Sequence, residues 1–132
     1  MTTSDLPAEG QPDVSNENTE APFDDVITLS TSTDEDGVVT VKVVGEVDTF
    51  TAPVLRSTLD GQLEQSPREL VIDLSGVQFL GSAGLAVLVE TQKSARSREV
   101  ALRLIATTRA VTRPLEVTGL IDLFTIADST AR

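Results

Sequence analysis

The sequence predicts a single α/β domain with a mixed, mostly parallel sheet of four or five strands covered by helices. Short β-branched and apolar runs alternate with longer helix-like segments, the first of which has leucines at four-residue spacing, and this is the pattern of strands joined by helices. At 132 residues the chain has the length of one domain and can bury a core without disulfides or metal. We therefore expect one domain over residues 25–132.

Residues 1–24 differ in composition from the rest of the chain. They are rich in Thr, Ser, Glu, Asp, Pro and Asn, and ordering such a segment costs more backbone entropy than its burial returns. Residues 1–36 contain ten acidic residues and no Lys or Arg, whereas the remaining chain balances 10 basic against 11 acidic residues. We expect a disordered acidic tail, which either aids solubility or guards a binding face electrostatically.

The first predicted elements are a hairpin and a helix. Two β-branched runs, 26–29 and 38–44, flank an acidic turn that ends in Gly37. A helix is expected to open at Thr51-Ala52-Pro53, since Pro is tolerated in the first turn, and to end at Ser66-Pro67. Its predicted buried stripe has four-residue spacing and consists of Leu55, Leu59 and Leu63.

The second half of the chain repeats the alternation of strands and helices. An apolar run of strand length, 70–74, is followed across a glycine-containing loop by a helix-like stretch, 83–95. The remaining predicted elements are a strand at 100–106, a short helix near 110–117 and a last edge strand at 123–126. Because strands that alternate with helices pair in parallel, the sheet is expected to be largely parallel.

The composition excludes much of enzyme chemistry. The chain has no Cys and no His, so it has no disulfide, thiol nucleophile or thiolate metal site, and it lacks the commonest general base and metal ligand. We expect no enzymatic activity, no metal and no cofactor. After residue 36 the charge is nearly balanced, so the basic face that nucleic acid requires is not expected.

The sequence also indicates where the protein resides. Its N-terminus has no basic residue followed by an apolar segment, as a secretory signal would, and no run approaches the roughly 18 apolar residues of a membrane span. We expect a cytoplasmic protein with no membrane partner.

Ser82 is the residue most suited to a functional role. It is predicted at the N-cap of the helix after strand 70–74, and a cap alone contributes about 1 kcal/mol. However, small and apolar residues occupy nearly every side of the stretch 83–89, so part of this helix is expected to meet a partner. A helix N-terminus also favours a phosphate, and roughly −1.5 to −2 added charges on an apolar contact surface would oppose binding.

Four segments resemble the STAS family in the order in which the family has them. Residues 79–85, FLGSAGL, are similar to its signature F-[ML]-D-S-[ST]-G-[LV]. Residues 45–48, GEVD, resemble its G-E-[LI]-D segment, and residues 71–75, VIDLS, resemble its buried strand. Residues 115–120, LEVTGL, followed by Leu123-Phe124, resemble its closing helix, turn and last strand. The resemblance covers residues 26 to 128 and implies a STAS-like fold.

The resemblance implies that the chain is an anti-sigma factor antagonist. Such proteins bind an anti-sigma factor, usually an ATP-dependent serine kinase, and so release its sigma factor. The kinase phosphorylates the Ser that corresponds to Ser82, and a phosphatase is a further implied partner. The implied partner-binding residues are Asp48, Thr49, Phe50, Thr51, Gly81, Ser82, Ala83, Gly84 and Leu85. For the loop residues 48–51 structural roles remain open, since Asp48 or Thr51 can cap a helix and Phe50 can be a core residue. We expect a monomer, with a dimer left open.

Three positions depart from the family pattern. Gly81 stands where the family has Asp, and Ala83 stands where it has Ser or Thr, so kinase recognition or the effect of the phosphate is expected to differ. Regulation by other means than phosphorylation stays open. Pro114 falls where the family's third helix continues, so this helix is expected to start late or to kink.

Other functions fit the sequence less well. An esterase motif needs Gly at position 80, which is Leu, and a receiver domain needs an acidic pair and a late Lys, whereas the lysines are Lys42 and Lys93. Asp73 is expected to hydrogen-bond the turn after its strand. The alternative that we retain is a STAS module that binds a nucleotide or lipid, or is a subunit of a transport or stress-sensing assembly. The lack of a glycine-rich phosphate loop argues against nucleotide.

Overall fold

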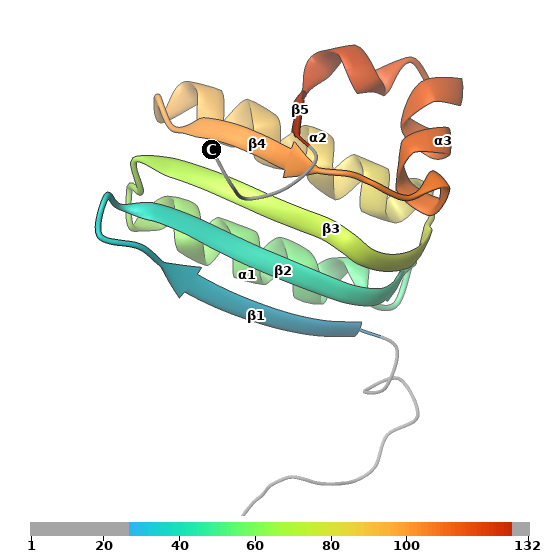
Figure 1. The fold of residues 1–132 in the computed structure, drawn as a ribbon, viewed down its shortest axis with the longest axis horizontal. Helices are drawn as coiled ribbons and strands as arrows, with labels where there is room; N and C mark the ends of the chain where they lie inside the picture. The colour runs from blue at the N-terminus through green and yellow to red at the C-terminus, as the bar shows by residue number, and fades with distance from the viewer. Residues whose placement is uncertain (1–26, 128–132) are drawn as a thin grey trace, which may run out of the picture.

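The computed structural model describes residues 27–127 and confirms a mixed, mostly parallel sheet with helices (Figure 1). The predicted tail, residues 1–24, lies outside the described residues. The five strands lie in the order β1-β2-β3-β4-β5; β1 is antiparallel to β2, and the other neighbours are parallel. The elements are β1 (Ile27–Thr33), β2 (Val38–Val47), α1 (Ala52–Glu64), β3 (Glu69–Leu80), α2 (Ser82–Ser97), β4 (Ala101–Ile105), α3 (Arg109–Val117), the 3₁₀ helix η2 (Leu120–Leu123) and β5 (Thr125–Ala127).

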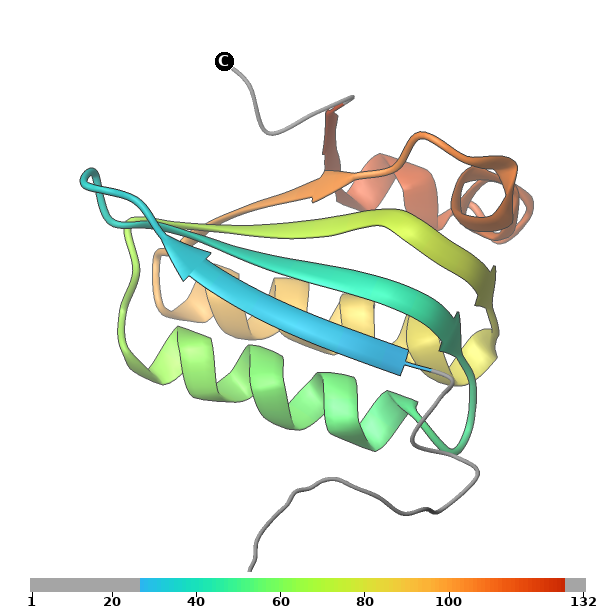
Figure 2. The ribbon, with the colours of Figure 1, turned by 60° about the horizontal axis from the view of Figure 1, so that its bottom comes forward.

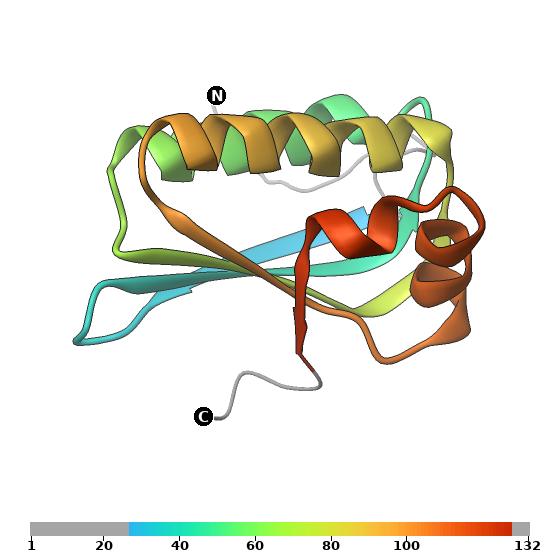
Figure 3. The same ribbon diagram turned by 90° about the horizontal axis from the view of Figure 1, so that it is seen from above.

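The core lies between the sheet and two helices. Helices α1 and α2 lie side by side across one face of the sheet, while α3 packs beside the end of β3 (Figures 2 and 3). The predicted stripe of α1 is confirmed, since Leu55, Leu59 and Leu63 are all buried. They pack with strand residues that point to the same face, namely Val41, Val43, Leu70, Ile72, Leu74 and Leu104. Burial of this apolar face is the main stabilising contribution to the fold.

Strand β3 is longer than the predicted strand 70–74 and reaches Leu80. The predicted loop after residue 74 is therefore wrong, because Ser75 and Gly76 belong to a bulged strand and not to a turn. Along its pairing with β2, β3 has an extra residue at two places, between Asp73 and Gly76 and again before Phe79. Bulges bend a strand and increase its twist, and Figure 1 shows β3 curving at this end.

The first bulge is stabilised by side chains as well as by pairing. Oδ1 of Asp73 accepts hydrogen bonds from the backbone N–H of Ser75 at 3.0 Å and from its hydroxyl at 2.7 Å. The predicted hydrogen-bonding role of Asp73 is thus confirmed, although the bonded group lies in a bulge. At Gly76 an added Cβ would lie 2.8 Å from Cγ2 of Val44, so the bulge has room for glycine alone.

The C-terminal elements follow the predicted order with shifted ends. The short helix predicted near 110–117 is confirmed as α3, and Pro114 lies inside it, where it provides no N–H for the helical hydrogen-bond ladder. Gly119, with φ of +75°, then redirects the chain into η2. Because residues 120–123 form this 3₁₀ turn, the last strand begins at Thr125, later than the sequence predicted.

Two glycines provide a matched test of the packing. In Gly84→Ala, the new Cβ would lie 2.6 Å from Cγ1 of Val47 and 2.7 Å from Cδ1 of Leu80, so we expect a loss of about 1–3 kcal/mol in the free energy of unfolding. Gly61→Ala is the control, because nothing lies within 4 Å of its Cβ and alanine favours a helix; we expect a gain of about 0.5–1 kcal/mol. Urea denaturation of both variants measures these changes. If the two substitutions changed the free energy of unfolding equally, the close packing of α2 on Val47 and Leu80 would be contradicted.

Candidate functional site

The ends of β2 and β3 bring the two predicted partner-binding segments together. Val47 and Leu80 are partners in the parallel register, and the N–H of Gly81 donates to the carbonyl of Val47 at 2.9 Å. The loop after β2 and the start of α2 therefore lie next to each other at one end of the sheet (Figure 1). We call this surface the Ser82 edge and define it as residues 48–50, Val54, Phe79 and 81–83.

The loop 48–51 is a tightly hydrogen-bonded turn. Oδ1 of Asp48 accepts from the N–H groups of Phe50 at 2.9 Å and Thr51 at 3.0 Å. In return the N–H of Asp48 donates to Oγ1 of Thr51 at 2.9 Å, and that hydroxyl donates to the carbonyl of Glu46 at 2.8 Å. The carbonyl of Asp48 accepts from the N–H of Ala52, the first residue of α1, at 2.8 Å. This network holds the loop rigidly against the end of β2.

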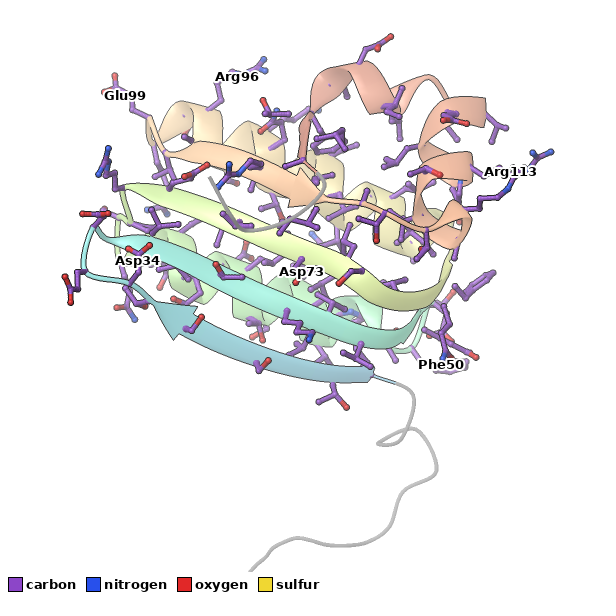
Figure 4. The ribbon with its side chains drawn as sticks, in the orientation of Figure 1. Asp34, Phe50, Asp73, Arg96, Glu99 and Arg113 are labelled. Carbon is purple, nitrogen blue, oxygen red and sulfur yellow. The ribbon has the colours of Figure 1, made fainter. Side chains whose placement is uncertain are left out.

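These bonds decide between the roles that the sequence left open for the loop. Thr51 is only 2% exposed and is the N-cap residue of α1, but its hydroxyl ties the loop to β2 and does not cap an N–H of the helix. Asp48 organises the turn that precedes the helix. Phe50 is not a core residue, since 67% of it is exposed, and Figure 4 shows it at this end of the sheet. Thr49 is also exposed.

Asp48 carries a fixed negative charge at the Ser82 edge. Its pKa lies below the ordinary value of 3.8, chiefly because the N–H of Thr51 donates to its carboxylate; the N–H of Phe50 lowers the pKa further, while partial desolvation opposes the shift. The carboxylate is therefore ionised throughout the neutral range.

Ser82 is the first residue of α2 and is exposed. The prediction that it is the N-cap is wrong: the N-cap is Gly81, whose carbonyl accepts from the N–H of Leu85 at 3.0 Å. The shift arises because β3 continues to Leu80 and leaves one residue between strand and helix. No side chain caps α2, so the Ser82 hydroxyl is not required for helix capping. It still lies in the first turn, where the helix dipole favours negative charge.

The residues after Ser82 differ in accessibility. Ala83 is half-buried and packs against the core, whereas Gly84 and Leu85 are buried within it. The apolar character of this stretch therefore largely reflects the protein's own core. Of the nine predicted partner-binding residues, the structure leaves six accessible, which are Asp48, Thr49, Phe50, Gly81, Ser82 and Ala83. Thr51, Gly84 and Leu85 lie beneath this surface and hold it in place.

Two accessible apolar residues at this edge were not predicted. Phe79 is 50% exposed at the end of β3, and Val54 is 50% exposed in the first turn of α1. Phe79 is the register partner of Glu46, whose carbonyl is bonded to Thr51, so it lies beside the turn that carries Phe50. The sequence places Phe79 in a loop, and only the second bulge shows toward which side it points. The Phe79 ring lies beside Gly81, and Phe50 and Val54 add exposed apolar area at the same end of the sheet.

A separate hollow lies on the face of the sheet that α1 and α2 do not cover. Its volume is about 450 Å³, and it is lined by charges of both signs and by hydroxyl groups, among them Lys42, Arg103, Asp73, Asp34 and Ser30. Asp34 and Asp73 are labelled on this face in Figure 4. Within residues 27–127 no three acidic side chains converge as a metal site requires. None of the helices in that range has the length and apolarity needed to cross a membrane.

The buried hydroxyl of Thr51 is expected to stabilise the loop. Thr51→Val keeps the shape but leaves the N–H of Asp48 and the carbonyl of Glu46 without this partner, which should lower the free energy of unfolding by about 1–3 kcal/mol. Thr51→Ser retains the hydroxyl and should cost about 1 kcal/mol or less. Urea denaturation compares the two variants. A larger loss in the serine variant would show that the methyl group matters more than the hydrogen bonds.

The lowered pKa of Asp48 predicts a pH dependence of stability. Because the folded-state pKa lies below the unfolded value, the contribution is fully present above about pH 4 and is lost as pH falls through the folded pKa. Asp48→Asn lacks this contribution, so its deficit relative to the wild type should be constant between pH 7 and 5 and shrink below pH 4. Denaturation curves at pH 7, 5, 4 and 3 measure it. A deficit that does not change with pH would contradict a charge-dependent role.

Comparisons with known proteins agree with this architecture. A family model described as "STAS domain" matches residues 30–132. The chain is 35% identical over 100 residues to the anti-sigma-F factor antagonist RsfB of Mycobacterium tuberculosis, covering 76% of this chain and 80% of the relative. It is 30% identical over 99 residues to an anti-sigma-B factor antagonist of Staphylococcus aureus, covering 75% of this chain and 92% of the relative.

A solved structure supports the same assignment. The crystal structure of an anti-sigma factor antagonist from Mycobacterium paratuberculosis superposes with a TM-score of 0.75 at 39% identity, covering 85% of this chain and 92% of that one. Sequence and fold thus lead to one conclusion: this chain belongs to the STAS domain family.

Proposed function

We propose that this protein is an anti-sigma factor antagonist whose Ser82 edge binds an anti-sigma factor and thereby releases a sigma factor. The relatives that carry this name are at least 30% identical over three quarters of the chain. The observation that carries the proposal is the placement of Ser82, an exposed hydroxyl at the start of a helix, within an apolar surface at the edge of the sheet.

The Ser82 edge has the properties of a binding surface for a protein. Its exposed apolar side chains, Phe50, Val54 and Phe79, provide area that loses water on contact, and aromatic residues are enriched among those that dominate binding energy. Gly81 and Ala83 allow another chain to approach closely. The hydrogen-bonded turn holds the loop in place before binding, which reduces the entropy lost on association.

The proposed switch is phosphorylation of Ser82 by an anti-sigma factor that is also a serine kinase. The γ-phosphoryl group of ATP would pass to Oγ of Ser82, the hydroxyl would lose its proton, and ADP would leave. The phosphate would lie at the positive end of the α2 dipole, so the fold tolerates it. In the complex the same charge would be buried at an apolar contact surface, and its desolvation would cost on the order of several kcal/mol. A phosphatase would restore binding.

We propose a cytoplasmic, monomeric protein that is a substrate of its partner and is not itself an enzyme. Gly81, at the position of the family's Asp, lies directly before Ser82, so the kinase that modifies this chain would recognise a neighbour without charge.

Substitution of Ser82 tests the switch. We expect Ser82→Glu to weaken binding to the anti-sigma factor at least tenfold, which is about 1.4 kcal/mol, and Ser82→Ala to bind as the wild type does. Because no side chain caps α2, Ser82→Ala should alter stability by no more than about 0.5 kcal/mol. Ser97, exposed at the other end of α2, provides the matched control variants Ser97→Ala and Ser97→Glu. Calorimetry with purified candidate anti-sigma factors measures affinity.

Incubation with ATP and the same anti-sigma factors completes the test. Mass spectrometry should locate one phosphate on Ser82 in the wild type and in Ser97→Ala, and none in Ser82→Ala. If the wild type binds an anti-sigma factor but acquires no phosphate on Ser82, the proposed antagonist function stands and the proposed phosphorylation switch is wrong. If the wild type binds no anti-sigma factor, the proposed function is wrong.

A further inference from the structure

We infer that Phe79 and Gly81 act as one specificity-determining unit, in which the ring of Phe79 is an anchor for an apolar pocket of the anti-sigma factor. This inference rests on the proposed function, because it assigns the chemistry of the partner surface that meets the Ser82 edge.

The two residues share one space. A Cβ added at Gly81 would lie 3.1 Å from Cε2 and 3.3 Å from Cζ of Phe79, so the ring lies over the position that a side chain at residue 81 would need. Gly81 has φ of −90° and ψ of −178°, an extended conformation that any residue adopts. A side chain at residue 81 would therefore require the Phe79 ring to shift by a few tenths of an ångström, whereas the backbone does not require glycine.

This arrangement alters the chemistry next to Ser82. The signature that residues 79–85 resemble has Asp at the position of Gly81, where a carboxylate would suit a cationic group of the partner. In this chain the ring covers that position, and half of Phe79 is exposed to contact a partner. Asp48 lies on the neighbouring loop and not at residue 81, and its Oδ1 accepts from the N–H groups of Phe50 and Thr51. The flank of Ser82 thus presents an aromatic ring, which favours an apolar pocket.

Neighbouring residues hold the anchor in position. Phe79 is paired in register with Glu46, whose carbonyl accepts from the Thr51 hydroxyl, so the strand end and the loop are bonded to one another. Phe50 and Val54 continue the apolar surface from this loop into α1. A preformed apolar anchor at the centre of an interface contributes much of its binding energy.

Affinity measurements with the anti-sigma factor that the wild type binds test the inference. We expect Phe79→Ala to weaken binding at least tenfold, since truncation of an anchor typically has this effect, and Phe79→Leu to weaken it less than about threefold. The control is Leu123→Ala, because Leu123 is 43% exposed but lies on η2 beside β5; its affinity should match the wild type. Unfolding curves for each variant exclude a loss of fold, and Phe79→Leu retains most of the packing.

Substitution of Gly81 tests the shared space directly. Gly81→Asp should weaken binding at least tenfold, because it displaces the ring and adds a charge, whereas Gly81→Ala should have a few-fold effect through displacement alone. In a Phe79→Ala background Gly81→Asp should cause a smaller loss than in the wild type, since only the effect of the added charge remains, and Gly81→Ala should cause none.

The outcomes separate this inference from the proposed function. If the wild type binds an anti-sigma factor and either Phe79→Ala or Gly81→Asp binds it with the same affinity, Phe79 is not an apolar anchor. The proposed antagonist function is then retained. Absence of wild-type binding to every anti-sigma factor overturns both.

Discussion

The close approach of α2 to the end of β2 is the constraint on which the rest of the structure depends. Gly84 lies where any side chain would collide with Val47 and Leu80, so the first turn of α2 rests directly on the strand ends. The backbone bond from Gly81 to Val47 fixes the same junction. Because β2 and β3 are parallel, this contact brings the loop 48–51 beside Ser82, although more than thirty residues separate them in sequence.

The site follows from this junction and from the hydrogen bonds around it. Asp48 and Thr51 satisfy each other's backbone groups and leave Phe50 at the surface, while the second bulge of β3 presents Phe79 on the same edge. The exposed side chains of the surface are thus held in place by hydrogen bonds of Asp48 and of the buried Thr51. In the proposed switch a phosphate on Ser82 needs no conformational change, because its charge lies within the surface that must lose water.

Much of the fold could be predicted from the sequence, and the reasons for the errors are local. The leucine stripe of α1 and the alternation of strands and helices depend on periodicity, which the chain displays clearly. The extent of β3 does not follow from periodicity. Ser75-Gly76 has the composition of a turn, and only the pairing with β2 shows that it is a bulge. Because β3 continues to Leu80, only Gly81 lies between the strand and α2, and Gly81 is the N-cap where the sequence predicts Ser82. The resemblance names residues that the structure brings together at one end of the sheet, but it does not show which of them reach the surface, since the burial of Gly84 and Leu85 depends on tertiary packing.

Amide hydrogen exchange of the unmodified and Ser82-phosphorylated protein, each with and without the anti-sigma factor, tests the central claim most directly. The partner should slow exchange in residues 48–51 and 79–83 of the unmodified protein and change neither segment in the phosphorylated form. Protection confined to the uncovered sheet face around Lys42 and Arg103, or equal protection of both forms, would contradict it.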